Sequence, residues 1–81
     1  EIAGLSRSHF HALFRRHTGK TFVEYLNEVR VRAAVRLLKE TTSPILDVAL
    51  ACGFGNLSHF YHVFRRLTGQ TPRALRSHSE D

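Results

Sequence analysis

Histidine and serine side chains are the first candidates for chemistry in this sequence, since both act in catalysis and histidine also binds metals. His59 and His62 stand close to one helical turn apart, as two metal ligands would, but no third or fourth ligand of suitable type lies near them. The stretch Ser6-x-Ser8-His9 is followed by no acidic partner and no oxyanion arrangement. We therefore expect no enzyme activity, no cofactor and no metal site.

Arginine pairs point to a different chemistry, the binding of phosphate. Arg15-Arg16 and Arg65-Arg66 recur at equivalent positions of two similar segments, in a chain of formal net charge +5 and pI near 10.4. A basic balance of this kind favours a polyanionic partner. Charge alone does not separate nucleic acid from an acidic protein, so a basic helical protein-interaction module is kept as the alternative.

The two similar segments are near-copies of one another. Residues 8–21 read SHFHALFRRHTGKT and residues 58–71 read SHFYHVFRRLTGQT, with nine of the fourteen positions identical. Repetition of this kind indicates duplicated structural units, and two copies are too few for a solenoid. We expect two small helical modules joined by a long helix.

Apolar residues in each copy fall at helical spacing, which predicts one buried face per helix. The residues expected to be buried are Phe10, Leu13 and Phe14 in the first copy, and Phe60, Val63, Phe64 and Leu67 in the second. The opposite faces carry Ser8, His11, Ala12 and Arg15, and Ser58, Tyr61, His62 and Arg65, with no acid on either. Each helix is expected to start after a capping residue, Ser6 or Asn56, and to end at a left-handed glycine, Gly19 or Gly69.

The remaining chain predicts the other helices. Ser43 is expected to cap a helix with Pro44 in its first position, which ends at Gly53 and forms a helix-turn-helix with the second copy. Residues 21–40 lack Gly and Pro and predict a helix of ~28 Å whose apolar positions contact a module at each end. The expected division is a first, truncated helix-turn-helix at 1–20, a linker helix at 21–41, a second helix-turn-helix with a short final helix at 42–76, and a frayed polar tail at 77–81.

Cellular context is indicated by three absences in the sequence. The lone Cys52 has no partner for a disulfide and is expected to be a small buried hydrophobe in a reducing compartment. No apolar run reaches the ~18 residues of a membrane span, and no signal peptide is visible. We therefore expect a cytoplasmic protein without a membrane partner, and the opening at Glu1 without a methionine indicates a fragment of a longer chain.

The motifs together resemble the DNA-binding domain of the AraC/XylS family of bacterial transcription factors. They are Arg30-x3-Ala34-x2-Leu37-Leu38, Ile45-x2-Val48-Ala49-x3-Gly53-Phe54 and Ser58-x-Phe60-x3-Phe64-Arg65-Arg66-x2-Gly69-x-Thr71-Pro72-x3-Arg76. The resemblance implies an all-α fold with two helix-turn-helix units on a long helix, and both recognition helices in the major groove. The family's first helix and the start of its second are missing. Any effector or dimerising domain would lie upstream, outside these residues.

A recognition helix reads bases with its N-terminal residues, on the side opposite the core, whereas arginines further along suit phosphates. The expected base contacts are Ser8, His11, Ala12, Leu57, Ser58, Tyr61 and His62, and the expected phosphate contacts are Arg7, Arg15, Arg16, Arg65 and Arg66. Double-stranded DNA is the expected partner, with RNA polymerase as a second one.

Several of these residues have simpler interpretations. Ala12 either fills space or touches a thymine methyl group. Arg30 and Arg36 are by default a solvated helix face, with phosphate contact as the alternative. Phe14 and Phe64 are expected in the core, and the absence of an exposed aromatic platform argues against RNA.

Overall fold

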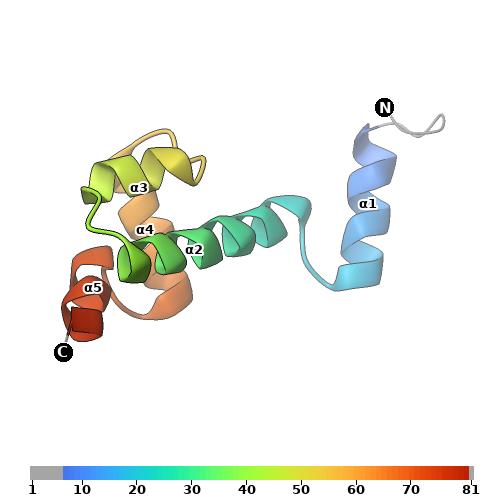
Figure 1. The fold of residues 1–81 in the computed structure, drawn as a ribbon. Coiled ribbons are helices and arrows are strands. Elements are labelled where there is room, and N and C mark those ends of the chain that lie inside the picture. Colours follow the sequence, from blue (N-terminus) through green and yellow to red (C-terminus); the bar gives the residue numbers. More distant parts are fainter. Residues whose placement is uncertain (1–6, 81) are drawn as a thin grey trace.

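The computed structural model describes residues 7–80, with side chains through residue 78. It contains five α-helices in this range and no strand: α1 (Arg7–Thr18), α2 (Phe22–Glu40), α3 (Ile45–Ala51), α4 (Leu57–Thr68) and α5 (Pro72–Glu80). Helices α3, α4 and α5 gather around the C-terminal part of α2, and α1 stands apart at its N-terminal end (Figure 1). The expected all-α fold is confirmed, in a molecule of 49 × 21 × 21 Å.

Helix α2 is the longest element, and local chemistry defines where it begins. The Thr21 hydroxyl accepts from the Glu24 N–H at 3.1 Å, and the Thr21 N–H donates to the Glu24 carboxylate at 2.8 Å. This reciprocal capping box satisfies backbone donors that the first helical turn leaves free. Hydrogen bonds from the Thr21 backbone and side chain lower the pKa of Glu24 below its usual value, with a smaller contribution from Arg15. The 19 residues of α2 agree with the predicted long helix.

The hydrophobic core lies between α2 and the three C-terminal helices. Phe60 and Phe64 of α4 are fully buried, and their ring centroids lie 5.4 Å apart. Phe54, in the turn before α4, packs 5.0 Å from Phe60. The core is completed by Val31, Ala34 and Leu38 of α2, Val48 and Ala49 of α3, Cys52, Val63 and Leu75. Every one of these residues follows Arg30 in the sequence, so the core belongs to the C-terminal part of the chain.

Helices α3 and α4 form the predicted helix-turn-helix. Gly53 has φ +96°, a left-handed conformation that glycine adopts without strain, and α4 begins where the Asn56 side chain accepts from the His59 N–H at 2.8 Å. One expectation about α3 is wrong. Pro44 occupies the N-cap position with extended backbone angles, one residue before the helix, and no side chain caps α3.

Helix α5 is longer than predicted, running to Glu80 where Arg76 was the expected end, so residues 77–80 are helical rather than a frayed tail. Arg76 lies in the middle of this helix and donates to three carbonyls. These are Leu38 at 3.2 Å, Ser43 at 2.6 Å and Thr41 at 3.3 Å. The guanidinium thereby satisfies a carbonyl in the last turn of α2 and two in the connection after it, and it fixes α5 to the connection leading into α3.

Helix α1 has no fully buried residue, which corrects the expected buried face. Phe10 and Phe14 are half-buried against Phe22 of α2, at ring-centroid distances of 5.8 and 5.4 Å, and Phe14 also meets Tyr25 at 5.5 Å. Within the described residues these contacts come from α2 alone, so the apolar side of α1 is covered only in part. Gly19 ends the helix with φ +77°, as predicted. The expected cap Ser6 lies outside the described residues.

Cys52 is buried, as predicted, and burial raises the pKa of its thiol. None of the helices in residues 7–80 is long and apolar enough to cross a membrane.

Candidate nucleic-acid interface

The outward face of α4 carries most of the residues predicted to contact bases. Leu57, Ser58 and His62 are exposed, and Leu57 and Ser58 lie at the N-terminal end of the helix, directly after the Asn56 cap. Tyr61 differs from its prediction, because it is half-buried and its ring meets Phe60 edge-to-face at 6.2 Å. The exposed face of α4 is therefore narrower than the spacing of its polar residues predicted, because Tyr61 lies at its edge.

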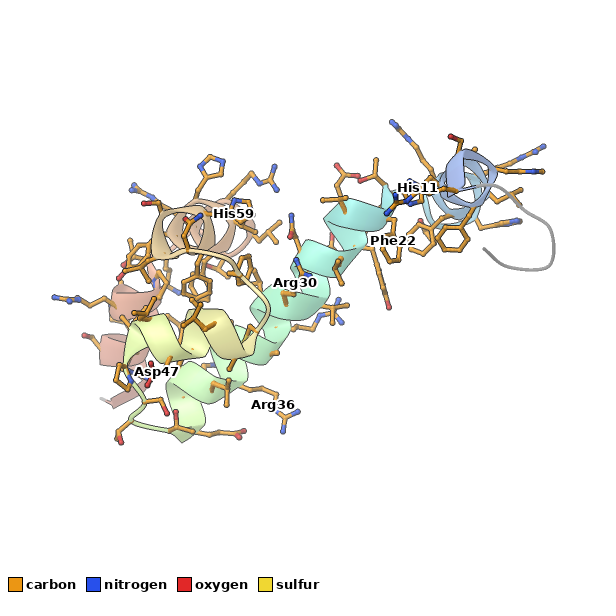
Figure 2. The ribbon with its side chains drawn as sticks, turned by 90° about the horizontal axis from the view of Figure 1, so that it is seen from above. His11, Phe22, Arg30, Arg36, Asp47 and His59 are labelled. Atoms are coloured by element: carbon orange, nitrogen blue, oxygen red, sulfur yellow. The ribbon has the colours of Figure 1, made fainter. Side chains whose placement is uncertain are left out.

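The equivalent face of α1 is exposed along its length. Ser8, His11 and Ala12 all lie on it, and none packs into the core. The His11 ring stacks on Phe22 with the ring planes 16° apart and the centroids separated by 5.8 Å. Figure 2 shows this pair at the corner between α1 and α2. The stacking holds His11 beside a recess of about 270 Å³ that Ala12 and Arg15 also line.

The five arginines predicted to contact phosphates are all exposed, and none of them forms an ion pair among the described residues. They are Arg7, Arg15 and Arg16 on α1, and Arg65 and Arg66 on α4. Arg66 also borders an acidic surface. It lines a recess between the α1–α2 turn and the end of α4 together with Glu24 and Glu28, where Lys20 forms an ion pair of 2.6 Å with Glu28. Arg15 and, to a smaller extent, Arg66 contribute to the lowered pKa of Glu24.

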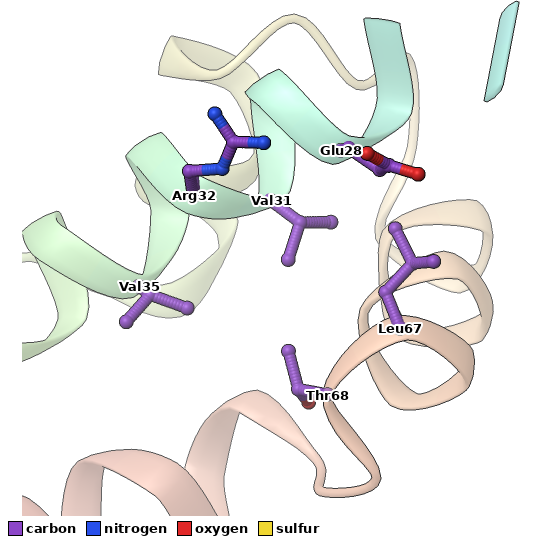
Figure 3. A pocket seen from close by; sticks show the side chains of 6 residues that line it. All are labelled: Glu28, Val31, Arg32, Val35, Leu67 and Thr68. Carbon is purple, nitrogen blue, oxygen red and sulfur yellow. The ribbon is translucent and has the colours of Figure 1, made fainter. Parts of the chain in front are cut away.

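Leu67 was predicted to be buried and is 40% exposed. Figure 3 shows why: Leu67 and Thr68 border a hollow of about 350 Å³ between α2 and the end of α4, opposite Val31 and Val35. The Leu67 side chain lies at the edge of this hollow, which leaves it partly open to solvent. The corresponding residue of the first copy is His17, which is also exposed.

Arg30 and Arg36 on α2 do not share one environment, although both were expected on a solvated face. Arg36 is exposed and forms only a long contact of 3.8 Å with Glu40. Arg30 is half-buried beside Gly53, and a Cβ atom at Gly53 would lie 3.0 Å from the Arg30 Nε. Arg30 is the first residue of one of the motifs quoted above, which could have indicated a specific role for it. The helical periodicity alone placed Arg30 on the solvated face. Arg76 ends the third motif, but the motif gave no indication of its contacts with the three carbonyls.

Within the described part of the chain, no group of three or more His, Cys, Asp or Glu side chains is arranged to hold a metal ion. His59 is exposed, and its ring lies 5.8 Å from Phe54.

The α3–turn–α4 geometry and the exposed basic faces define a helix-turn-helix protein. A family model described as "Helix-turn-helix domain" matches residues 1–78. The HTH-type transcriptional regulator GlxA of Rhizobium meliloti strain 1021 is 42% identical over 78 residues, a match that covers 96% of this chain and 24% of GlxA. This chain thus spans about a quarter of that relative.

Two solved structures resemble the fold closely. An AraC-type transcriptional regulator from Chromobacterium violaceum superposes with a TM-score of 0.83 and 34% identity, covering 94% of this chain and 68% of that one. The DNA-binding domain of AdpA in complex with a target DNA gives a TM-score of 0.86 and 35% identity, covering 91% and 67%. The chain belongs to the AraC-type helix-turn-helix family, and the resemblance stated from its motifs is confirmed.

Proposed function

We propose that this chain is the sequence-specific DNA-binding domain of a bacterial transcriptional regulator, and that it acts in the cytoplasm by placing α1 and α4 in adjacent major-groove segments. The observation that carries the proposal is the pair of α1 and α4. They repeat one motif at two ends of α2, and each presents an exposed basic face without an acid. A family relative, AdpA, is known as a complex with its target DNA, which supports the same function here.

In this proposal the N-terminal halves of the two helices read bases, and the arginines hold the backbone. Ser8, His11 and Ala12 read one element, and Leu57, Ser58, Tyr61 and His62 read the other. Arg7, Arg15, Arg16, Arg65 and Arg66 contact phosphates. Because the two reading sets differ, the two elements differ in sequence, and the site is directional rather than palindromic.

We propose two DNA-binding units, residues 1–20 and residues 42–80, and the second includes the whole of α5. Helix α2 is the rod that joins the two units. We propose RNA polymerase as a second partner of the full-length regulator, consistent with the transcriptional role of relatives such as GlxA. The reducing interior of a bacterium also suits the single free thiol of Cys52.

The test begins with selection of duplexes bound by the chain from a random pool. Successive major-groove faces on one side of DNA recur every ~34 Å, about one helical turn. We expect the selected duplexes to hold two different elements one turn apart, and five inserted base pairs to reduce affinity to that of a single element. If α2 holds the two helices closer than one turn, the DNA bends toward the protein at a cost on the order of 1–6 kcal/mol.

Two results would contradict the proposal in different ways. Equal affinity with and without the five-base-pair insertion would mean that only one helix reads DNA. Failure to select any duplex, or binding that does not weaken with salt, would favour the basic protein-interaction module, because counterion release makes binding to DNA steeply salt-dependent.

A further inference from the structure

Arg30 is a basic side chain outside the set of residues proposed above to contact DNA, and phosphate contact was only the alternative interpretation of it in the sequence. It lies on α2 beside Gly53, with a Cβ position at that glycine 3.0 Å from its Nε and 3.4 Å from its Cζ. Gly53 is left-handed and belongs to the turn that leads into α4. The guanidinium is therefore pressed against the turn from which the helix with exposed Leu57 and Ser58 starts.

The position of Arg30 also differs from that of the other arginines of α2. Figure 2 shows Arg30 between His59, at the start of α4, and His11 on α1, whereas Arg36 extends from a different side of α2. Arg30 thus lies on the stretch of α2 between its α1 end and the turn that leads into α4. Arg36 does not, which makes it a matched residue on the same helix for comparison.

No hydrogen bond or ion pair neutralises Arg30 among the residues whose side chains the structure describes. A half-buried guanidinium has lost part of its hydration, and burial of an unpaired charge is costly unless a partner satisfies it. Arginine is also the residue whose planar fork suits phosphate, by two parallel hydrogen bonds. An anion from outside the chain is the partner that this environment lacks.

We propose that Arg30 is a third anchoring point for DNA, contacting a backbone phosphate between the two elements read by α1 and α4. The inference deepens the proposed function and rests on it. The contact with Gly53 holds the guanidinium in place before DNA arrives, so that little side-chain freedom is lost on binding. A side chain at residue 53 would be strained by the positive φ, and its Cβ would require the Arg30 guanidinium to shift slightly.

The first experiment compares Arg30→Gln with Arg36→Gln, each of which removes one positive charge from α2. Affinity for a duplex carrying both selected elements is measured across a salt series by fluorescence anisotropy. Loss of one phosphate contact is expected to reduce the slope of log K against log salt by about 0.9 and to weaken binding about tenfold near 0.1 M salt. Arg36→Gln is expected to change the slope by much less.

The second experiment locates the phosphate by placing single neutral methylphosphonates along the backbone between the elements. One or two positions are expected to weaken binding of the unmodified chain and to have no further effect on Arg30→Gln. If Arg30 has only a structural role, Arg30→Gln would lower the affinity but leave the salt slope unchanged. The methylphosphonates would then weaken binding of Arg30→Gln as much as they weaken binding of the unmodified chain. These two results would overturn the inference.

The Arg30→Lys variant covers the case in which the glutamine variant does not fold. A lysine ammonium keeps the positive charge but cannot make two parallel hydrogen bonds. The methylphosphonate at the sensitive position is therefore expected to reduce the affinity of Arg30→Lys less than that of the unmodified chain. An equal loss of affinity in both chains would mean that Arg30 does not contact this phosphate. If the unmodified chain selects no duplex at all, the proposed function itself fails. If the chain binds DNA but Arg30→Gln and Arg36→Gln have the same slope of log K against log salt, only the third anchoring point is overturned.

Discussion

Helices α1 and α4 carry nearly the same motif and lie in different environments. In α4, Phe60 and Phe64 are fully buried by α2, α3 and α5, whereas in α1 Phe10 and Phe14 are half-buried against α2 alone. Both helices nevertheless end at a left-handed glycine, and in both a threonine hydroxyl donates to the carbonyl four residues earlier, at 2.8 Å in α1 and 2.9 Å in α4.

The two helices show that one motif can fix where a helix ends without fixing how deeply the helix is buried. Helix ends depend on short-range chemistry, so the two copies end alike. Burial depends on which elements surround the helix, and the described part of the chain supplies three for α4 and one for α1. The first of the four predictions below compares the two regions directly, and the other three test single interactions made by Arg76, Asn56 and Glu24.

The largest difference is expected between Phe64→Ala and Phe14→Ala. Deletion of the fully buried Phe64 ring should destabilise the C-terminal helices by ~3–5 kcal/mol, the usual cost of truncating a core aromatic. Phe14→Ala should cost about 1–2 kcal/mol or less, because less apolar area is removed from water. Urea unfolding followed by circular dichroism measures both.

His62→Ala serves as the control for this pair, since His62 is exposed and should leave the unfolding midpoint unchanged. Equal destabilisation by Phe14→Ala and Phe64→Ala would contradict the unequal burial of the two helices.

The next effect concerns Arg76, which connects α5 to the end of α2. Arg76→Ala should lower stability by ~2–3 kcal/mol, because three carbonyls lose a charged donor. Arg76→Lys should recover only part of this loss, since an ammonium lacks the fork that reaches them together. Hydrogen exchange should show loosening in α3 and α5, with α1 unaffected; a uniform increase over the whole chain would be inconsistent with a local clamp.

A smaller effect is expected at the start of α4. Asn56→Ala removes the acceptor of the His59 N–H and should cost about 1 kcal/mol, whereas Asn56→Asp should retain the cap. Thermal melts of the two variants provide the measurement. Identical melting temperatures for both variants would mean that the side-chain cap contributes nothing measurable to the helix.

The smallest effect is a pH dependence at the start of α2. The pKa of Glu24 is lowered in the folded chain, chiefly by its hydrogen bonds with Thr21, so the carboxylate stabilises the fold above its unfolded pKa. This contribution is lost as the pH falls through the folded pKa. The melting temperatures of the unmodified chain and of Glu24→Gln should therefore differ at pH 6 and converge below about pH 4. A constant difference over this range would exclude Glu24 as the source.

Sequence reasoning predicted the features that depend on neighbouring residues, such as the left-handed Gly19 and Gly69 and the long α2. It failed where distant segments decide the outcome. Leu67 fits the apolar stripe of α4 but borders the hollow between α2 and the end of α4. Tyr61 fits the outward face of α4 but is half-buried against the core cluster that α4 forms with the other C-terminal helices. Residues 77–80 have weak helical signals, yet they continue α5 beyond the point at which Arg76 attaches it to α2. The base and phosphate contacts stay predictions that DNA-binding measurements must decide.

Because every core residue follows Arg30, the exposed side chains of Ser8 and Ala12 contribute little to the stability of the core. Substitutions at these two positions can accumulate without destabilising the fold, whereas His11 stacks on Phe22 and α4 must keep its buried face. Over evolutionary time this favours faster divergence at one end of the molecule. A lineage of such proteins would explore new binding preferences through its first helix while its second changed slowly.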